Sequence, residues 1–280
     1  MANNNEQLIK VVEGRITRNS WLVNSRGKRI SEKFVLYHSN EEGAFVTLNT
    51  SKGEYVYHKS TGSILLEKAR SAKVIRITEN LFGVKFYTRR NDKREDFARI
   101  YSAEGKLLLS GLNSVGGMHN GLFSAMKSEK WGYMDKNLNF VIPPSWEEVS
   151  PFNENGYAVV YFKERKRIGV IDKKGSYVLS PVSYTNAIFE TQDLLRVRDS
   201  EASYGIINVK GDVIVPVVYD NVTLKGNFFI VRSGCKYGLI DTSGNEIFEC
   251  IYPEIIETDK KFVVQDFARL EVEKVKEVTK

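Results

Sequence analysis

Short apolar runs of four to six residues recur along the chain, and Gly, Asn, Asp or Ser residues separate them. Runs of this length between turn residues are typical of β-strands. Four similar hairpins in the C-terminal half are the clearest. In each, an aromatic residue (Ile in one copy) followed by Gly opens a short run that ends in Asp or Asn. A turn then leads into a second run that ends in an aromatic residue. Their first runs are WGYMD (131–135), IGVID (168–172), YGIIN (204–208) and YGLID (237–241).

This hairpin is an internal repeat. The polar residue that ends its first run recurs at spacings of 33 to 43 residues, with a mean of about 36. A third apolar run, such as YAVVYF (157–162), fills the gap between copies. Because no copy can bury its own apolar face, neighbouring copies must stack. Seven copies result, marked by Asn24, Lys59, Ser102, Asp135, Asp172, Asn208 and Asp241.

The recurring residues have structural explanations. Gly in the Ser-Gly and Lys-Gly turns supplies the positive φ of a tight hairpin, and Gly after the aromatic residue lets another backbone approach closely. Pro181 and Pro216 stand near the end of the second strand, where a missing N–H is tolerated. The turn acids Asp135, Asp172 and Asp241 recur once per copy, which indicates Asx turns and not an active site.

These motifs resemble the WG repeat, a bacterial β-repeat named for its Trp-Gly pair. The resemblance covers residues 120–265 and is weaker over 8–119. Two positions depart from the pattern, because Ile168 replaces Trp and Leu138 replaces the turn Gly. The matching residues are Trp131, Gly132, Asp135, Gly156, Ala158, Val159, Val160, Gly169, Ile171, Asp172, Gly175, Pro216, Tyr219 and Asp220. The resemblance implies a non-catalytic interaction module and brings no catalytic residues with it.

The repeat predicts an all-β fold, and we favour a small seven-bladed β-propeller over an open β-solenoid or array. The N-terminal run LIKVV (8–12) would complete the last blade, although 33 to 37 residues is short for a four-stranded blade. We expect one repeat domain over 1–265, with degenerate copies in 8–119 and clear copies in 120–265. The tail, 266–280, is expected to form a strand or a short helix.

Composition adds little to this picture. The 280 residues carry 41 Lys and Arg against 35 Asp and Glu, a mixed surface with a net charge of +6. No signal peptide is visible and no apolar run is long enough to cross a bilayer, so we expect a cytoplasmic protein without membrane insertion. The two cysteines, Cys235 and Cys250, do not form a disulfide framework, which fits a reducing compartment.

The histidines, which commonly act as bases in catalytic sites, are scattered along the sequence. His38, His58 and His119 fall at different positions of different copies. The sequence contains no Cys-x-x-Cys, HExxH or other metal-ligand cluster. We therefore expect no catalytic residues, no metal and no cofactor.

Two basic segments, 88–99 and 163–167, fall between the third strand of one copy and the next hairpin. In a closed array both would emerge on the same face. They form either a contact face for nucleic acid or another polyanion, or two solvated loops whose acids offset part of the charge. The candidate binding residues are Arg89, Arg90, Lys93, Arg94, Lys163, Arg165, Lys166 and Arg167.

Repeats without a catalytic set favour a protein–protein interaction scaffold whose partner is another protein. The alternative is a module that binds nucleic acid or another polyanion through the two basic loops. An enzyme with its site in a propeller channel is a third hypothesis, and the sequence offers almost nothing for it.

Overall fold

The computed structural model describes residues 10–13, 19–23, 29, 32–59, 63–90, 93–162, 164, 166–257, 261–264 and 276–279. The regular elements in these ranges are β-strands, which confirms the all-β prediction. No helix in the described ranges is long and apolar enough to span a membrane. The chain divides into an N-terminal unit, Met1–Trp146, and a C-terminal unit, Glu147–Lys280, and each is described by itself.

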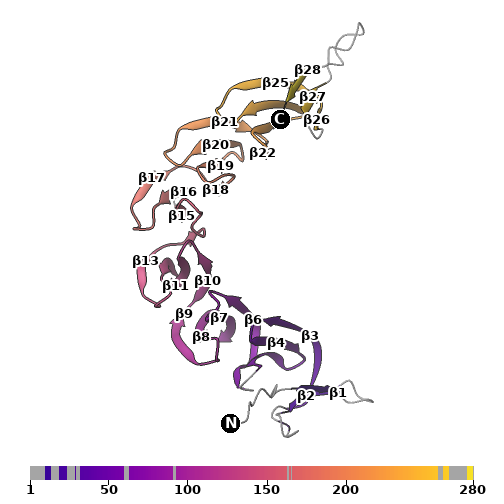
Figure 1. Ribbon diagram of the computed structural model, residues 1–280, viewed down its shortest axis with the longest axis vertical. Coiled ribbons are helices and arrows are strands. Elements are labelled where there is room, and N and C mark those ends of the chain that lie inside the picture. The colour runs from indigo at the N-terminus through magenta and orange to yellow at the C-terminus, as the bar shows by residue number, and fades with distance from the viewer. Residues whose placement is uncertain are drawn as a thin grey trace, which may run out of the picture. The chain divides into compact units, whose positions relative to one another are not determined.

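The C-terminal unit consists of small antiparallel sheets in which each strand pairs with the next strand of the chain (Figure 1). Three of its sheets have four strands and the last described sheet has three. The first and last strands of every sheet are therefore edge strands. The strands are β14 (Glu148–Val149), β15 (Ala158–Phe162), β16 (Arg167–Ile171), β17 (Tyr177–Val182), β18 (Asn186–Phe189), β19 (Leu194–Arg198), β20 (Tyr204–Asn208), β21 (Val213–Tyr219), β22 (Asn221–Lys225), β23 (Phe228–Ser233), β24 (Lys236–Asp241), β25 (Glu246–Tyr252), β26 (Ile255–Glu257), β27 (Lys261–Val264) and β28 (Lys276–Thr279).

Each four-stranded sheet contains one strand more than the sequence predicted. The three predicted runs form its last three strands, and a short, partly polar strand such as β14 or β22 precedes them. The two residues of β14 and the mixed polar and apolar residues of β22 form no apolar run that hydrophobic periodicity could reveal. Four strands fit into a copy of about 36 residues because the turns are tight; Gly234 and Cys235 alone join β23 to β24.

The N-terminal unit joins its first copies through shared strands. A nine-stranded sheet runs from β1 to β9, and β10 to β13 form a four-stranded sheet. The first part of β6 pairs with β5 and its last part pairs with β7, with Ser71 at a φ of 53° where the strand changes partner. The strands are β1 (Lys10–Glu13), β2 (Asn19–Val23), β3 (Phe34–Glu42), β4 (Phe45–Thr50), β5 (Gly53–His58), β6 (Ile64–Arg76), β7 (Leu81–Arg90), β8 (Lys93–Ser102), β9 (Leu107–Leu112), β10 (Ser114–His119), β11 (Leu122–Lys127), β12 (Lys130–Met134) and β13 (Phe140–Trp146).

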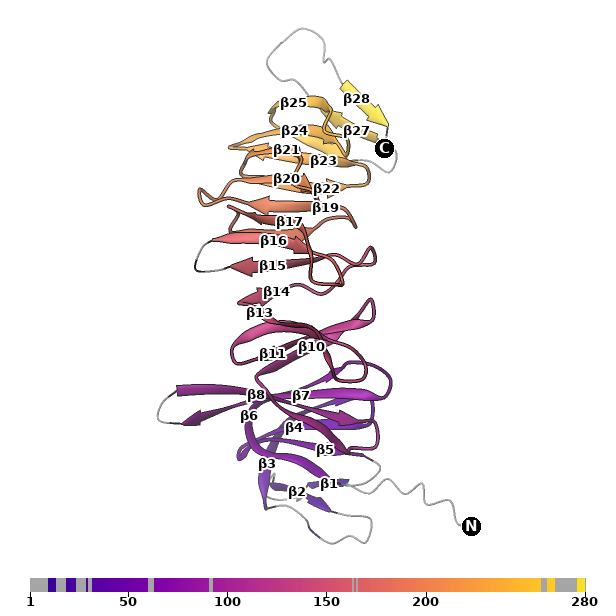
Figure 2. The same ribbon diagram turned by 90° about the vertical axis from the view of Figure 1, so that its left-hand side faces the viewer.

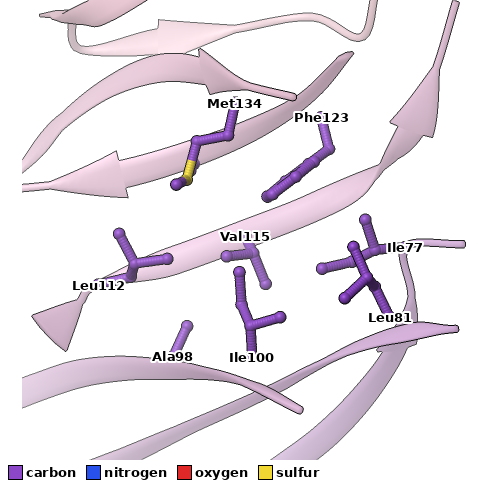
Figure 3. Packing of buried hydrophobic residues seen from close by; sticks show 9 residues of the cluster. Ile77, Leu81, Ala98, Ile100, Leu112, Val115, Phe123 and Met134 are labelled. Carbon is purple, nitrogen blue, oxygen red and sulfur yellow. The ribbon is translucent and has the colours of Figure 1, made fainter. Parts of the chain in front are cut away.

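The apolar cores lie between successive sheets, as the stacking argument requires. In the N-terminal unit, Ile100 and Leu112 pack against Val115, Phe123 and Met134 of the following sheet (Figure 3). In the C-terminal unit, similar clusters join β15–β17 to β18–β20, β20–β21 to β22–β24, and β24–β25 to β27. Stacking of neighbouring copies is thus confirmed within each unit.

The aromatic residue before Gly lies directly opposite the aromatic residue that ends the second run. Trp131 pairs with Trp146, and Tyr204 pairs with Tyr219. The fourth strand is bulged beside the intervening Gly, and a Cβ on Gly132 would lie 2.4 Å from the carbonyl oxygen of Ile142. The prediction that this Gly permits a close backbone approach is confirmed.

The recurring turn acids form Asx turns, as predicted. Asp241 Oδ1 accepts the backbone N–H of Ser243 at 2.9 Å and that of Asn245 at 2.8 Å. Gly244 follows with a φ of 91°. Asp135, Asp172 and Asn208 accept the same two backbone bonds in their copies. These residues are therefore committed to the hairpins.

Replacing Asp241 by Ala is expected to destabilise the chain by about 1 kcal/mol, because two backbone donors lose their acceptor. Hydrogen bonds lower the pKa of Asp241, and the bond from the Asn245 side chain contributes most. Since the folded pKa lies below the unfolded pKa, this stabilisation is present above the unfolded pKa and is lost as pH falls through the folded pKa. Urea denaturation from pH 7 downward should show the gap between Asp241→Ala and the parent protein closing at acid pH.

Asp241→Asn is the matched control, because Asn208 makes the same backbone bonds through an amide oxygen. It should keep most of the stability at pH 7. Equal losses for the Asn and Ala variants would contradict the Asx-turn role.

The described strands at the two ends of the chain pair within their own units. Lys10–Val12 of the N-terminal run belong to β1, which pairs with β2. The strand beside β27 is β28, from the C-terminal tail, and residues 265–275 lie outside the described residues. The tail, which is nearer to β27 in sequence, thus pairs with it at a small loop-closure cost, and the expectation that the N-terminal run completes the last copy stays a prediction. Whether the copies close into a ring stays a prediction.

Candidate functional site

The first basic segment, 88–99, was expected to be a loop and instead belongs to a long β-hairpin. β7 and β8 pair from Leu81 opposite Ser102 to Arg90 opposite Lys93. Among the described pairs, Tyr87 is the last residue of β7 that pairs with β6, and Ala98 is the first residue of β8 that pairs with β9. The distal part of the hairpin therefore extends past its sheet as a two-stranded ribbon (Figure 2), and this extension accounts for the longest repeat spacing. Pairing satisfies backbone groups that a loop would leave to water.

The register of this ribbon places predicted binding residues opposite one another. Arg89 pairs with Arg94, and Arg90 pairs with Lys93. Closer to the sheet, Thr88 pairs with Glu95. Four cationic residues thus occupy two successive cross-strand pairs at the end of the ribbon, with acidic residues nearer its base.

The second basic segment, 163–167, connects β15 to β16. Lys163 and Arg165 lie outside the described residues. Lys166 is exposed at a φ of 46°, and the guanidinium of Arg167 donates a hydrogen bond to the carbonyl oxygen of Pro181 in β17. Arg167 therefore has a contact within its own sheet. Because the two basic segments belong to different units, their common face stays a prediction.

His58 lies in the interior of the N-terminal unit. His58 is buried, its Nε2 lies 2.6 Å from the carbonyl oxygen of Ala103, and its ring packs edge-on against Phe45. This is a structural histidine that ties two copies together. Within the described ranges, no group of three His, Cys, Asp or Glu residues is placed to hold a metal ion.

Two cavities lie at the base of the ribbon, and sequence reasoning missed both. One, of about 340 Å³, is lined by Glu95, Asp96, Phe97, Asn113, Met126 and Glu129. The other, of about 410 Å³, is lined by Phe86, Phe97, Ala98, Arg99, Ser110 and Gly111. Phe86 lies opposite Phe97 in the β7–β8 register, and this cross-strand position is the signal that the linear sequence hides.

A third feature is a row of exposed apolar side chains on edge strands of the C-terminal unit. Tyr177 is on β17, Val213 and Val218 are on β21, and Ile251 is on β25. Their exposed fractions are 45%, 56%, 64% and 52% in that order. We call these four residues the edge row.

Several solved structures resemble the chain at low sequence identity. A crystal structure titled as the eukaryotic initiation factor has a TM-score of 0.47 at 10% identity, covering 93% of this chain and 78% of that chain. Kluyveromyces lactis Hsv2 has a TM-score of 0.40 at 9% identity, covering 88% and 98%. BamB from Moraxella catarrhalis has a TM-score of 0.30 at 10% identity, covering 92% and 79%. Among curated proteins, none matches this sequence.

The family comparison finds repeats in the C-terminal half. The model of the WG containing repeat matches three segments, the first of which begins at the Trp131-Gly132 pair. The copy that opens with Ile168 begins no match of its own, in line with its departure from the Trp-Gly pattern. Repeats of the WG type therefore lie at residues 131–164, 204–236 and 237–265 of this chain.

Proposed function

We propose that this chain is a non-catalytic protein-interaction scaffold of the cytoplasm, and that the edge row is its contact surface. The observation that carries the proposal is the exposure of Tyr177, Val213, Val218 and Ile251 on the last strands of three consecutive sheets. Contiguous exposed apolar side chains commonly mark protein interaction sites. Cys235 is exposed, Cys250 is half-buried and neither forms a disulfide, which fits a reducing compartment.

The edge strands follow one another along one side of the C-terminal unit (Figure 1). Two turn glycines lie against the preceding edge strand: a Cβ on Gly211 would lie 2.8 Å from Leu179 Cδ1, and one on Gly244 would lie 2.8 Å from the carbonyl oxygen of Ile214. The exposed side chains on β17, β21 and β25 therefore belong to adjacent strands. They offer a partner exposed apolar side chains on successive strands.

The partner is expected to contact side chains and not to add a strand. Pro181 in β17 and Pro216 in β21 lack the N–H that an added strand would need. In addition, β17, β21 and β25 are all irregular in their pairing with the preceding strand. Such irregular edges discourage edge-to-edge pairing.

The recurring polar residues support a non-catalytic role. The turn residues Asp135, Asp172, Asn208 and Asp241 already accept backbone hydrogen bonds within their own hairpins. Tyr161 donates its hydroxyl to the carbonyl oxygen of Ala187 at 2.5 Å, and burial, with Glu148 nearby, raises its pKa to about 12. These groups serve the fold.

The test is co-purification of the tagged full chain from cells that produce it. The parent protein should retain a partner at near-equal amounts, and the double variant Val213→Glu, Val218→Glu should retain about tenfold less, since charges replace the apolar contact. Ile188→Glu is the matched control: Ile188 is equally apolar and 50% exposed, but it lies on β18 at the opposite edge of its sheet. Loss of the partner in the control as well, or no partner with the parent protein, would contradict the proposal.

A second candidate function is polyanion binding by the β7–β8 ribbon. The observation that favours it is the pairing of Arg89 with Arg94 and of Arg90 with Lys93. Like charges directly opposite each other destabilise a strand pair, and a bound polyanion would offset that cost. The salt dependence of nucleic-acid binding is its test.

A further inference from the structure

The cavity of about 410 Å³ at the base of the ribbon opens on three adjacent strands. Phe86 comes from β7, Phe97, Ala98 and Arg99 come from β8, and Ser110 and Gly111 come from β9. Its volume falls within the range of small-molecule sites. A Cβ built on Gly111 would meet no atom within 4 Å, so the backbone leaves this side of the cavity open.

One wall of the cavity is aromatic. The rings of Phe86 and Phe97 are stacked with their centroids 5.6 Å apart. The guanidinium carbon of Arg99 lies 5.3 Å from the centroid of the Phe86 ring. Phe86 is buried and Phe97 is half-buried, so a flat ligand can contact chiefly the Phe97 ring, together with a cation, within the same cavity.

Arg99 has no counter-ion in the described part of the chain. Its side chain is half-buried, and its contact there is with the Phe86 ring, whereas Arg196 in the C-terminal unit pairs with Glu190 at 3.0 Å. Partial burial of a charge costs free energy unless an opposite charge or a hydrogen-bond acceptor compensates for it. The cavity thus presents an uncompensated cation beside an apolar, aromatic surface.

We propose that this cavity binds a small aromatic molecule that carries one anionic group, such as an aryl carboxylate or sulfonate. The aromatic part contacts chiefly the Phe97 ring. The anionic group accepts hydrogen bonds from the Arg99 guanidinium, which presents a planar set of donors suited to carboxylate geometry. The proposal is independent of the scaffold function, because the edge row lies in the other unit.

Isothermal titration of the full chain with 2-naphthoate tests the proposal, with 2-naphthamide as the uncharged analogue. We expect a naphthoate Kd below about 1 mM, and a loss of at least tenfold, which is about 1.4 kcal/mol, both for the amide and for Arg99→Gln. The matched control is Arg198→Gln. Its guanidinium lies 5.6 Å from the Tyr204 ring in a similar cation–π contact in the other unit, and the variant should bind naphthoate like the parent protein.

A second variant separates loss of the site from loss of the fold. Ser110 is exposed on β9, so Ser110→Phe should fill the cavity entrance without changing the melting temperature and should abolish naphthoate binding. Three results would each overturn the proposal: no naphthoate binding by the parent protein, equal binding of the amide, or unchanged naphthoate binding by folded Ser110→Phe.

Discussion

Replacing Gly132 by Ala should destabilise the N-terminal unit by about 2–4 kcal/mol. The added Cβ would lie 2.4 Å from the carbonyl oxygen of Ile142, 2.7 Å from the nitrogen of Pro144 and 2.8 Å from the carbonyl carbon of Pro143. All three atoms are backbone, so no side chain can rotate away. The fourth strand would have to move, and the Trp131–Trp146 pair beside it would separate. Chemical denaturation followed by tryptophan fluorescence reports directly on this sheet.

Gly117→Ala is the matched control in the same unit. A Cβ there would meet its nearest atoms, the Arg76 carbonyl oxygen and His119 Nε2, at 3.7 Å, an ordinary contact distance. Gly169→Ala should fall between the two, because its nearest neighbours, Tyr177 and Leu179, lie at 3.1 and 3.2 Å. Equal stability of Gly132→Ala and Gly117→Ala would contradict the close-approach role of the Trp-Gly pair.

The double variant Arg89→Glu, Arg90→Glu should lose nucleic-acid binding if the ribbon is a polyanion contact. The probe is a 20-base-pair duplex DNA, labelled and followed by fluorescence anisotropy. With four phosphate contacts, affinity should fall about 100-fold between 50 and 200 mM salt, because counterions are no longer released as favourably. A two-stranded ribbon also has the dimensions that the major groove admits.

Charge reversal elsewhere provides the comparison. Lys106→Glu, Lys127→Glu changes the net charge by the same amount at two exposed positions of the same unit. It should lower affinity far less than the Arg89, Arg90 variant. If DNA affinity does not change with salt, or if both double variants lower it equally, the ribbon is not a specific polyanion contact.

The sequence predicted the features that depend on single copies. The roles of Asp241 and Gly244 in the turn, and of Gly132 in packing, depend on contacts within one hairpin, so the sequence of a single copy is enough to predict them. The extra first strands escaped prediction because β14 has only two residues, while the longer β10 and β22 mix polar and apolar residues, so no continuous apolar run marks them. The sharing of β6 between two copies also escaped, since a lone Ser71, without Gly, Asn or Asp beside it, marks the point where the strand changes partner.

The candidate sites depend on register, and a linear sequence does not give register. The segment 88–99 was interpreted as a loop because charge dominates its composition. Its strand character becomes evident only when Phe86 is placed opposite Phe97 and Arg89 opposite Arg94. The same cross-strand geometry creates the cavity beside Arg99, whose lining residues come from positions 86 to 111. The edge row likewise depends on knowing which strand of each sheet is last.

Site-specific photo-cross-linking tests most directly whether a partner protein docks on the edge row. A photoreactive phenylalanine analogue placed at Val213 or at Val218 should give a covalent adduct with one partner in cells, because both positions are more than half exposed on β21. The same analogue at Ile188, on the opposite edge, should give none. Adducts at Ile188 with the same partner, or none at Val213 and Val218, would contradict the account.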